Sequence, residues 1–161
     1  MFGKKSEKSP TEILCISLYI VGGHFMKTVK IKSNEVLSSE LKESWRLEEK
    51  LLKTNDPLSE KEIRFLKARA EEGVPLGEFS YGLYYLLHLN DEKTAEEWWN
   101  KFFYHSNGFG LWKASGIFAY LGDQYYEWSM KCLRRSAWRQ FKLSKMMLAD
   151  MKKHPYKFPE A

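Results

Sequence analysis

Small residues recur inside aromatic-rich helical stretches at intervals close to the period of helical-hairpin repeats. Gly82 in FSYGLYY, Gly116 in KASGIFA and Ser144 in FKLSKMM are 34 and 28 residues apart. Where two packed helices cross at about 8–10 Å, the side chain at the crossing must be small. A glycine inside a helix costs about 1 kcal/mol relative to alanine, so its reuse at matching positions favours a packing role. The spacing therefore predicts stacked helical hairpins, an architecture that usually holds another molecule.

Helical signals extend over most of the chain. A capping box at Ser59 and Glu62, a cap at Asp91 and stop signals at Gly73 and Asn107 divide it into segments. The helices expected are 34–53, Ser59 to Gly73, 76–89, Asp91 to Asn107, 111–121, 125–135 and 137–152. We therefore expect an all-α fold, a short right-handed superhelix (α-solenoid) of antiparallel helix hairpins.

Residues 13–32 differ from the rest because their apolar residues alternate as in strands. Gly22 and Gly23 can supply the positive φ angles of a tight turn, so an N-terminal β-hairpin is expected. The other interpretation places the true start at Met26, with the first 25 residues dispensable. The expected domains are 1–33, a tail with the hairpin; 34–154, the helical repeat domain; and 155–161, a C-terminal tail.

Composition limits the class of protein. With 161 residues and 43% apolar content, the chain can bury one sizeable core. Cys15 and Cys132 lack CxxC spacing, which fits a reducing compartment and a cytoplasmic protein. The apolar run Ile13 to Val21 is far shorter than the ~20 residues that cross a bilayer. Because lysines precede this run, secretion stays open as the alternative, although acidic residues and Pro10 between them argue against it.

Several segments carry a family resemblance. They are ARAEEG at 68–73, GLYY at 82–85, EKTAEEWWNK at 92–101 and, more weakly, residues 125–136. Over roughly residues 60–150 the chain resembles Sel-one-like repeat proteins, relatives of the tetratricopeptide repeat. The resemblance implies a right-handed solenoid whose first helices line a concave groove. It also implies a role as an adaptor or scaffold that binds other proteins.

The segment 76–89 is apolar nearly all round, so it must be covered on both sides. One face is expected to pack on its hairpin partner and the other to line the concave groove. Either the helix at 34–53 and the hairpin fill this groove, or a partner or second copy does. For the second case the candidate contacts are Phe79, Tyr81, Tyr84 and Tyr85.

Positive charge is concentrated at the C-terminal end. Residues 125–161 hold nine basic and three acidic side chains, giving +6 in a chain of net charge +5. On a continuous helix the basic side chains would share one face, which fits an acidic protein surface or a phosphate backbone. A break near Ser136 would split that face. The candidate set is Arg135, Trp138, Arg139, Lys142 and Lys145, with Lys131 on the same stripe.

Signals for catalysis are missing from the sequence. Its four histidines are scattered without metal-ligand spacing, and no P-loop, dinucleotide fingerprint or nucleophile elbow occurs. We expect no catalytic residue, no metal and no cofactor. The predicted function is a non-enzymatic protein-protein interaction module, either an adaptor or an inhibitor or immunity-type protein that occupies a partner's acidic surface. The alternative is a nucleic-acid-binding protein that uses the basic C-terminal helices.

Overall fold

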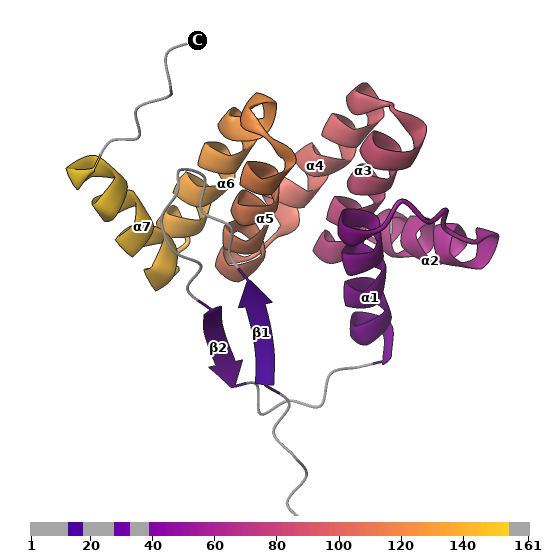
Figure 1. Cartoon of the computed structure of the whole chain (residues 1–161), viewed down its shortest axis with the longest axis horizontal. Coiled ribbons are helices and arrows are strands. Elements are labelled where there is room, and N and C mark those ends of the chain that lie inside the picture. The colour runs from indigo at the N-terminus through magenta and orange to yellow at the C-terminus, as the bar shows by residue number, and fades with distance from the viewer. Residues whose placement is uncertain (1–12, 18–27, 33–38, 155–161) are drawn as a thin grey trace, which may run out of the picture.

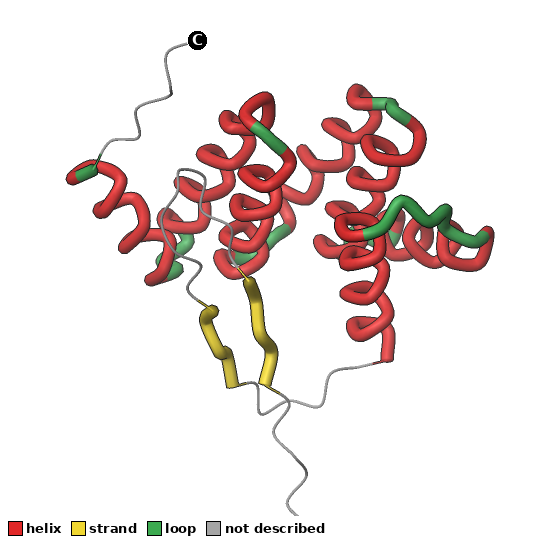
Figure 2. The backbone as a smooth tube through the Cα atoms, in the orientation of Figure 1, coloured by secondary structure: helices red, strands yellow, loops and turns green. Residues whose placement is uncertain are grey.

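The structure, a computed structural model, describes residues 13–17, 28–32 and 39–154. Figures 1 and 2 show helices that follow one another in chain order from α2 at one end to α7 at the other. The elements are β1 (Ile13–Ser17), β2 (Thr28–Lys32), α1 (Ser39–Lys53), α2 (Glu60–Glu71), α3 (Pro75–Leu89), α4 (Glu92–His105), α5 (Gly108–Leu121), the 3-10 helix η1 (Asp123–Tyr125), α6 (Tyr126–Trp138) and α7 (Lys142–Lys153). Residues 39–154 thus confirm the all-α expectation, whereas the right-handed superhelical course stays a prediction.

The two strands pair antiparallel, with Ile13 opposite Lys32 and Ile16 opposite Val29. The predicted turn at Gly22 and Gly23 lies outside the described residues, as does Asn34, the expected cap of the first helix. The N-terminal hairpin as a unit therefore stays a prediction.

Side-chain caps set the starts of α2, α4 and α5. Ser59 and Glu62 form the predicted capping box, because each side chain accepts from the other's backbone N–H. Asp91 accepts from Thr94 N at 3.0 Å and opens α4 as expected. Asn107 accepts from Gly110 N at 2.8 Å, so α5 begins at Gly108, three residues before the expected Leu111.

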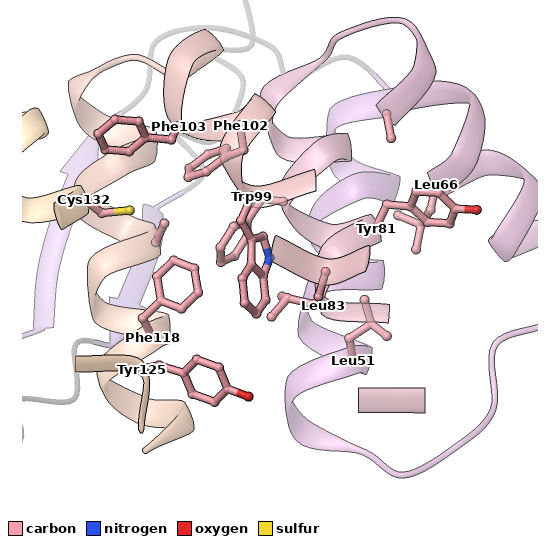
Figure 3. Packing of buried hydrophobic residues seen from close by; sticks show 14 of the residues in the cluster. Leu51, Leu66, Tyr81, Leu83, Trp99, Phe102, Phe103, Phe118, Tyr125 and Cys132 are labelled. Atoms are coloured by element: carbon pink, nitrogen blue, oxygen red, sulfur yellow. The ribbon is translucent and has the colours of Figure 1, made fainter. Parts of the chain in front are cut away.

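Gly82 lies where α3 crosses α4, which confirms its predicted packing role. A Cβ there would be 2.5 Å from Nε1 of Trp99 and 3.1 Å from the carbonyl oxygen of Ala95. Trp99 is fully buried and meets the ring of Phe118 edge-on at 4.8 Å. Figure 3 shows Trp99 between Leu83 on one side and Phe118 on the other. The absent side chain of Gly82 makes room for the indole that joins the two hairpins.

Serines make the close approaches between α5, α6 and α7. Ser144 of α7 is buried and donates to Ser136 Oγ of α6 at 2.6 Å, which confirms a small residue at that crossing. Ser136 in turn donates to the carbonyl oxygen of Gly108 at 2.5 Å. Between α5 and α6 the contact is made by Ser115, whose carbonyl accepts from Ser129 Oγ at 2.9 Å. This is the contact expected of its neighbour Gly116, whose own packing role stays a prediction.

The first helix covers α3 from within the chain. Leu47 and Leu51 of α1 belong to the same buried cluster as Phe79 of α3. Glu48 is also buried and pairs with Lys113 of α5, so α1 is tied to the second hairpin too. Of the four residues expected to line an open concave groove, Phe79 and Tyr81 are therefore covered by the chain's own helices.

Candidate binding groove

The aromatic candidates on α3 divide by burial. Phe79 and Tyr81 are only 2% and 6% exposed to solvent, so the prediction that a partner contacts them is wrong. Phe79 packs on Phe102 with ring centroids 4.9 Å apart, and Tyr81 packs on Trp98 at 5.3 Å. The physical reason is that packed helices of the same chain cover both faces of α3.

Tyr84 and Tyr85 lie partly exposed towards the C-terminal end of α3. Tyr84 stacks on His88, and the hydroxyls of Tyr85 and Tyr81 are 3.4 Å apart. Burial, followed by the hydrogen bond to Tyr85, raises the pKa of Tyr81 well above its usual range. The two tyrosine hydroxyls thus lie within hydrogen-bond distance beside a ring stack.

The basic stripe is split, although not where the sequence placed the break. The predicted final helix is present as α7, but it begins at Lys142 and not at residue 137, because α6 continues to Trp138 and the chain turns at Gln140, with φ of 65°. Gln140 N donates to the carbonyl of Ala137, and Phe141 N donates to that of Ser136. These two bonds form a Schellman motif, which ends a helix through a residue in the left-handed region.

This turn separates the candidate basic residues. Arg135 and Trp138 are on α6, and Arg139 is its C-cap. Lys142 and Lys145 lie in the first turn of α7, where Lys145 is hydrogen-bonded to Gln140. Arg139 instead turns towards α4, donating from Nη2 to the carbonyl oxygen of Tyr104 at 3.2 Å.

An open groove of about 820 Å³ runs between α4 and α6, which lie side by side in Figure 1. Two residues of α4 and six of α6 line it. They are Asn100, Phe103, Glu127, Trp128, Lys131, Arg134, Arg135 and Trp138. The groove therefore combines three cations with three aromatic rings, and it contains the predicted candidates Arg135 and Trp138 and Lys131 of the predicted stripe.

Aromatic and cationic groups alternate along its floor, in an arrangement we call the ladder. The Lys131 ammonium lies 4.4 Å from the ring centre of Trp128 and 4.7 Å from that of Phe103. The Arg135 guanidinium lies 5.6 Å from Phe103 and 4.6 Å from Trp138. From Trp128 to Trp138 the ladder follows α6 for about 15 Å, at ~1.5 Å per residue. Each contact contributes about 0.5–1 kcal/mol at an exposed site, so the ladder holds its cations in place.

The groove cations have no anionic partner within residues 39–154. No carboxylate there forms a salt bridge with Lys131, Arg134 or Arg135, whereas Arg46, Lys50 and other cations of α1 and α2 do pair. The Nε atom of Arg135 is buried and lacks a hydrogen-bond partner. Trp138 beside it is 68% exposed. This end of the groove presents positive charge and an open indole to solvent.

The other end carries acidic groups. Glu127 lines the groove and is exposed. Glu96 of α4 accepts a hydrogen bond from Trp128 Nε1 at 3.3 Å, and Asn100 accepts from Lys131 at 3.4 Å. The groove thus has two arginines towards Trp138 and two carboxylates towards Trp128, where Lys131 is the one cation among the lining residues.

Five groove residues were not predicted from the sequence: Asn100, Phe103, Glu127, Trp128 and Arg134. One sequence signal could have found part of the set. Trp98 and Trp128 are each followed three residues later by a lysine, and both lysines lie over their tryptophan, Lys101 at 3.9 Å. Residues three apart on a helix are neighbours, so this repeated pair predicts two exposed cation–π contacts.

The remaining chemistry is limited. Burial raises the pKa of Cys132 to about 12, so this thiol stays protonated at neutral pH. Among the described residues no three His, Cys, Asp or Glu side chains come together as metal ligands. The described helices include none that combines the length and apolar character needed to cross a bilayer.

No family model, curated protein or solved structure matches the chain.

Proposed function

We propose that this chain is a non-enzymatic protein-binding module of the cytoplasm, built as a short superhelix of helix hairpins. Its α4–α6 groove receives an acidic segment of another protein, in the manner of an adaptor or an inhibitor or immunity-type protein. The observation that carries the proposal is the ladder's positive end, where Arg134 and Arg135 have no carboxylate partner among the described residues and Trp138 is exposed.

The composition of the groove supports a protein partner. Tryptophan, tyrosine and arginine supply most strong contacts at protein interfaces. The guanidinium of Arg135 lies 4.6 and 5.6 Å from two ring centres, and a planar guanidinium can stack on rings and bind a carboxylate. Because these side chains already pack on one another, ordering them on binding costs little conformational entropy.

Nucleic acid fits the same groove less well. Single-stranded nucleic acid needs positive charge along its whole path and ring faces for base stacking. Here Glu127 and Glu96 lie at one end, and the ladder's own cations cover faces of Trp128 and Phe103. The turn at Gln140 also moves Lys142 and Lys145 away onto α7.

A test begins with a displayed library of random 12-residue peptides, selected on the folded chain. We expect enriched peptides rich in Asp and Glu, and we expect their binding to be lost in the Lys131→Glu/Arg134→Glu variant. Both side chains are exposed, so the fold should survive the exchange. The matched control is Lys142→Glu/Lys145→Glu, which makes the same change in net charge on α7 and should bind normally.

Three results would overturn the proposal. The first is selected peptides that bind both double variants equally. The second is single-stranded RNA or heparin that binds the wild type more tightly than any selected peptide and is lost only in Lys131→Glu/Arg134→Glu. The third is sedimentation showing self-association that the same variant abolishes, which would assign the groove to a second copy of the chain.

A further inference from the structure

The groove has a charge polarity that a uniformly acidic ligand would not match. Arg134 and Arg135 lie at one end, and Glu127 lies two helical turns earlier on the same side of α6. Glu96 of α4 adds a second carboxylate beside Trp128, at the Glu127 end. No lysine or arginine of residues 39–154 forms a salt bridge with Glu127.

The distance between the two ends sets the size of the ligand. Seven residues separate Glu127 from Arg134, which is about 10 Å along the helix axis at 1.5 Å per residue. An extended peptide covers this distance in about three residues at ~3.3 Å each. A helical peptide covers it in about seven residues. Opposite charges at either spacing on a partner segment can meet both ends of the groove together.

We propose that the groove selects a bipolar segment of its protein partner, with Asp or Glu meeting Arg134 and Arg135 and with Lys or Arg meeting Glu127 and Glu96. The inference rests on the proposed function and narrows its ligand class. The Glu127 end acts against uniformly acidic segments, because like charges facing each other oppose binding. Phe103, which lies next to both Lys131 and Arg135, supplies the apolar contact between the charged ends.

The energetic effect of the acidic end is modest and measurable. An exposed ion pair changes affinity by up to about fivefold. Exchanging a ligand's basic residue for Glu replaces an attraction with a repulsion, so the affinity should fall by about fivefold to twentyfold. The same exchange in the peptide should raise its affinity for the Glu127→Lys variant by a similar factor.

The experiment repeats the 12-residue selection on wild type, on Glu127→Lys and on Asp150→Lys, which makes the same charge change on an exposed position of α7. Wild type and Asp150→Lys should enrich peptides with an acidic residue and a basic residue three or seven positions apart. Glu127→Lys should enrich peptides that are acidic at both positions. Isothermal titration of the strongest wild-type peptide, with and without its basic residue changed to Glu, then measures the fold-change.

The outcomes separate this inference from the function on which it rests. If wild type enriches uniformly acidic peptides that Lys131→Glu/Arg134→Glu protein does not bind, bipolar selection is overturned and the acidic-segment function stands. If the same peptides emerge from wild type and Glu127→Lys, the acidic end has no role and the inference is again overturned. If no selected peptide is sensitive to Lys131→Glu/Arg134→Glu, both fail together.

Discussion

Replacing Gly82 by alanine tests the helix crossing on which the fold depends. The new methyl carbon would lie 2.5 Å from Nε1 and 2.7 Å from Cδ1 of Trp99, well inside normal contact at about 3.5–4.0 Å. The indole cannot retreat freely, because Phe118 and Tyr125 meet it edge-on at 4.8 and 5.9 Å. Overpacking of this kind costs about 1–3 kcal/mol, and alanine's helix propensity returns about 1 kcal/mol. With rings on several sides, we expect the variant to lose about 1–2 kcal/mol of unfolding free energy.

Urea unfolding followed by far-UV circular dichroism measures this loss of unfolding free energy. In thermal unfolding, the same loss should lower Tm by about 4–8 °C in a domain of this size. Trp99→Phe supplies the matched control, because phenylalanine lacks the pyrrole atoms that the new methyl would strike. In a double-mutant cycle, Gly82→Ala should cost about 1 kcal/mol less in the Trp99→Phe background than in wild type. The predicted clash is refuted if Gly82→Ala is as stable as wild type. It is also refuted if the losses of unfolding free energy from Gly82→Ala and Trp99→Phe simply add in the double variant.

Three further substitutions test separate contacts. Lys113→Met should cost about 3 kcal/mol in urea unfolding, because it leaves the carboxylate of Glu48 buried and unpaired; Glu48→Gln should then restore most of the loss. Gln140→Gly should raise the unfolding free energy by about 1 kcal/mol, since glycine adopts its positive φ without steric cost, and a loss would count against the turn described here. The Arg46 hydrogen bond, together with the Ser59 backbone N–H, lowers the pKa of Glu62 to about 2. The stabilisation that ionised Glu62 contributes is therefore complete above the ordinary carboxyl pKa and is lost as the pH falls towards 2. When the pH is lowered from about 5 to 2, the unfolding free energy of Glu62→Gln should therefore fall less than that of wild type.

Local signals were the part of this fold that the sequence could predict. The caps at Ser59, Asp91 and Asn107 depend on residues within three positions, so they could be read directly. The end of α6 could not, because glutamine is not a residue that typically adopts positive φ. Its conformation depends on the Schellman bonds and on α7 packing back against α6.

Pairing between distant segments was the part that sequence reasoning could not supply. Phe79 belongs to a helix that looks like a binding surface, and only the packing of α1, α4 and α5 shows that it is core. The groove likewise depends on Phe103 and Arg135 meeting across two helices that are distant in the sequence. Arg135 was predicted as a candidate for its charge, whereas its position between Phe103 and Trp138 follows from the hairpin stack.

The indole N–H signals of the tryptophans test the central claim most directly. Trp128 and Trp138 line the groove, whereas Trp99 and Trp112 are buried in the core. In a two-dimensional NMR titration with the strongest selected peptide, we expect the signals of Trp128 and Trp138 to shift and those of Trp99 and Trp112 to stay in place. Saturating binding that moves neither groove signal would contradict the assignment of the binding site to this groove.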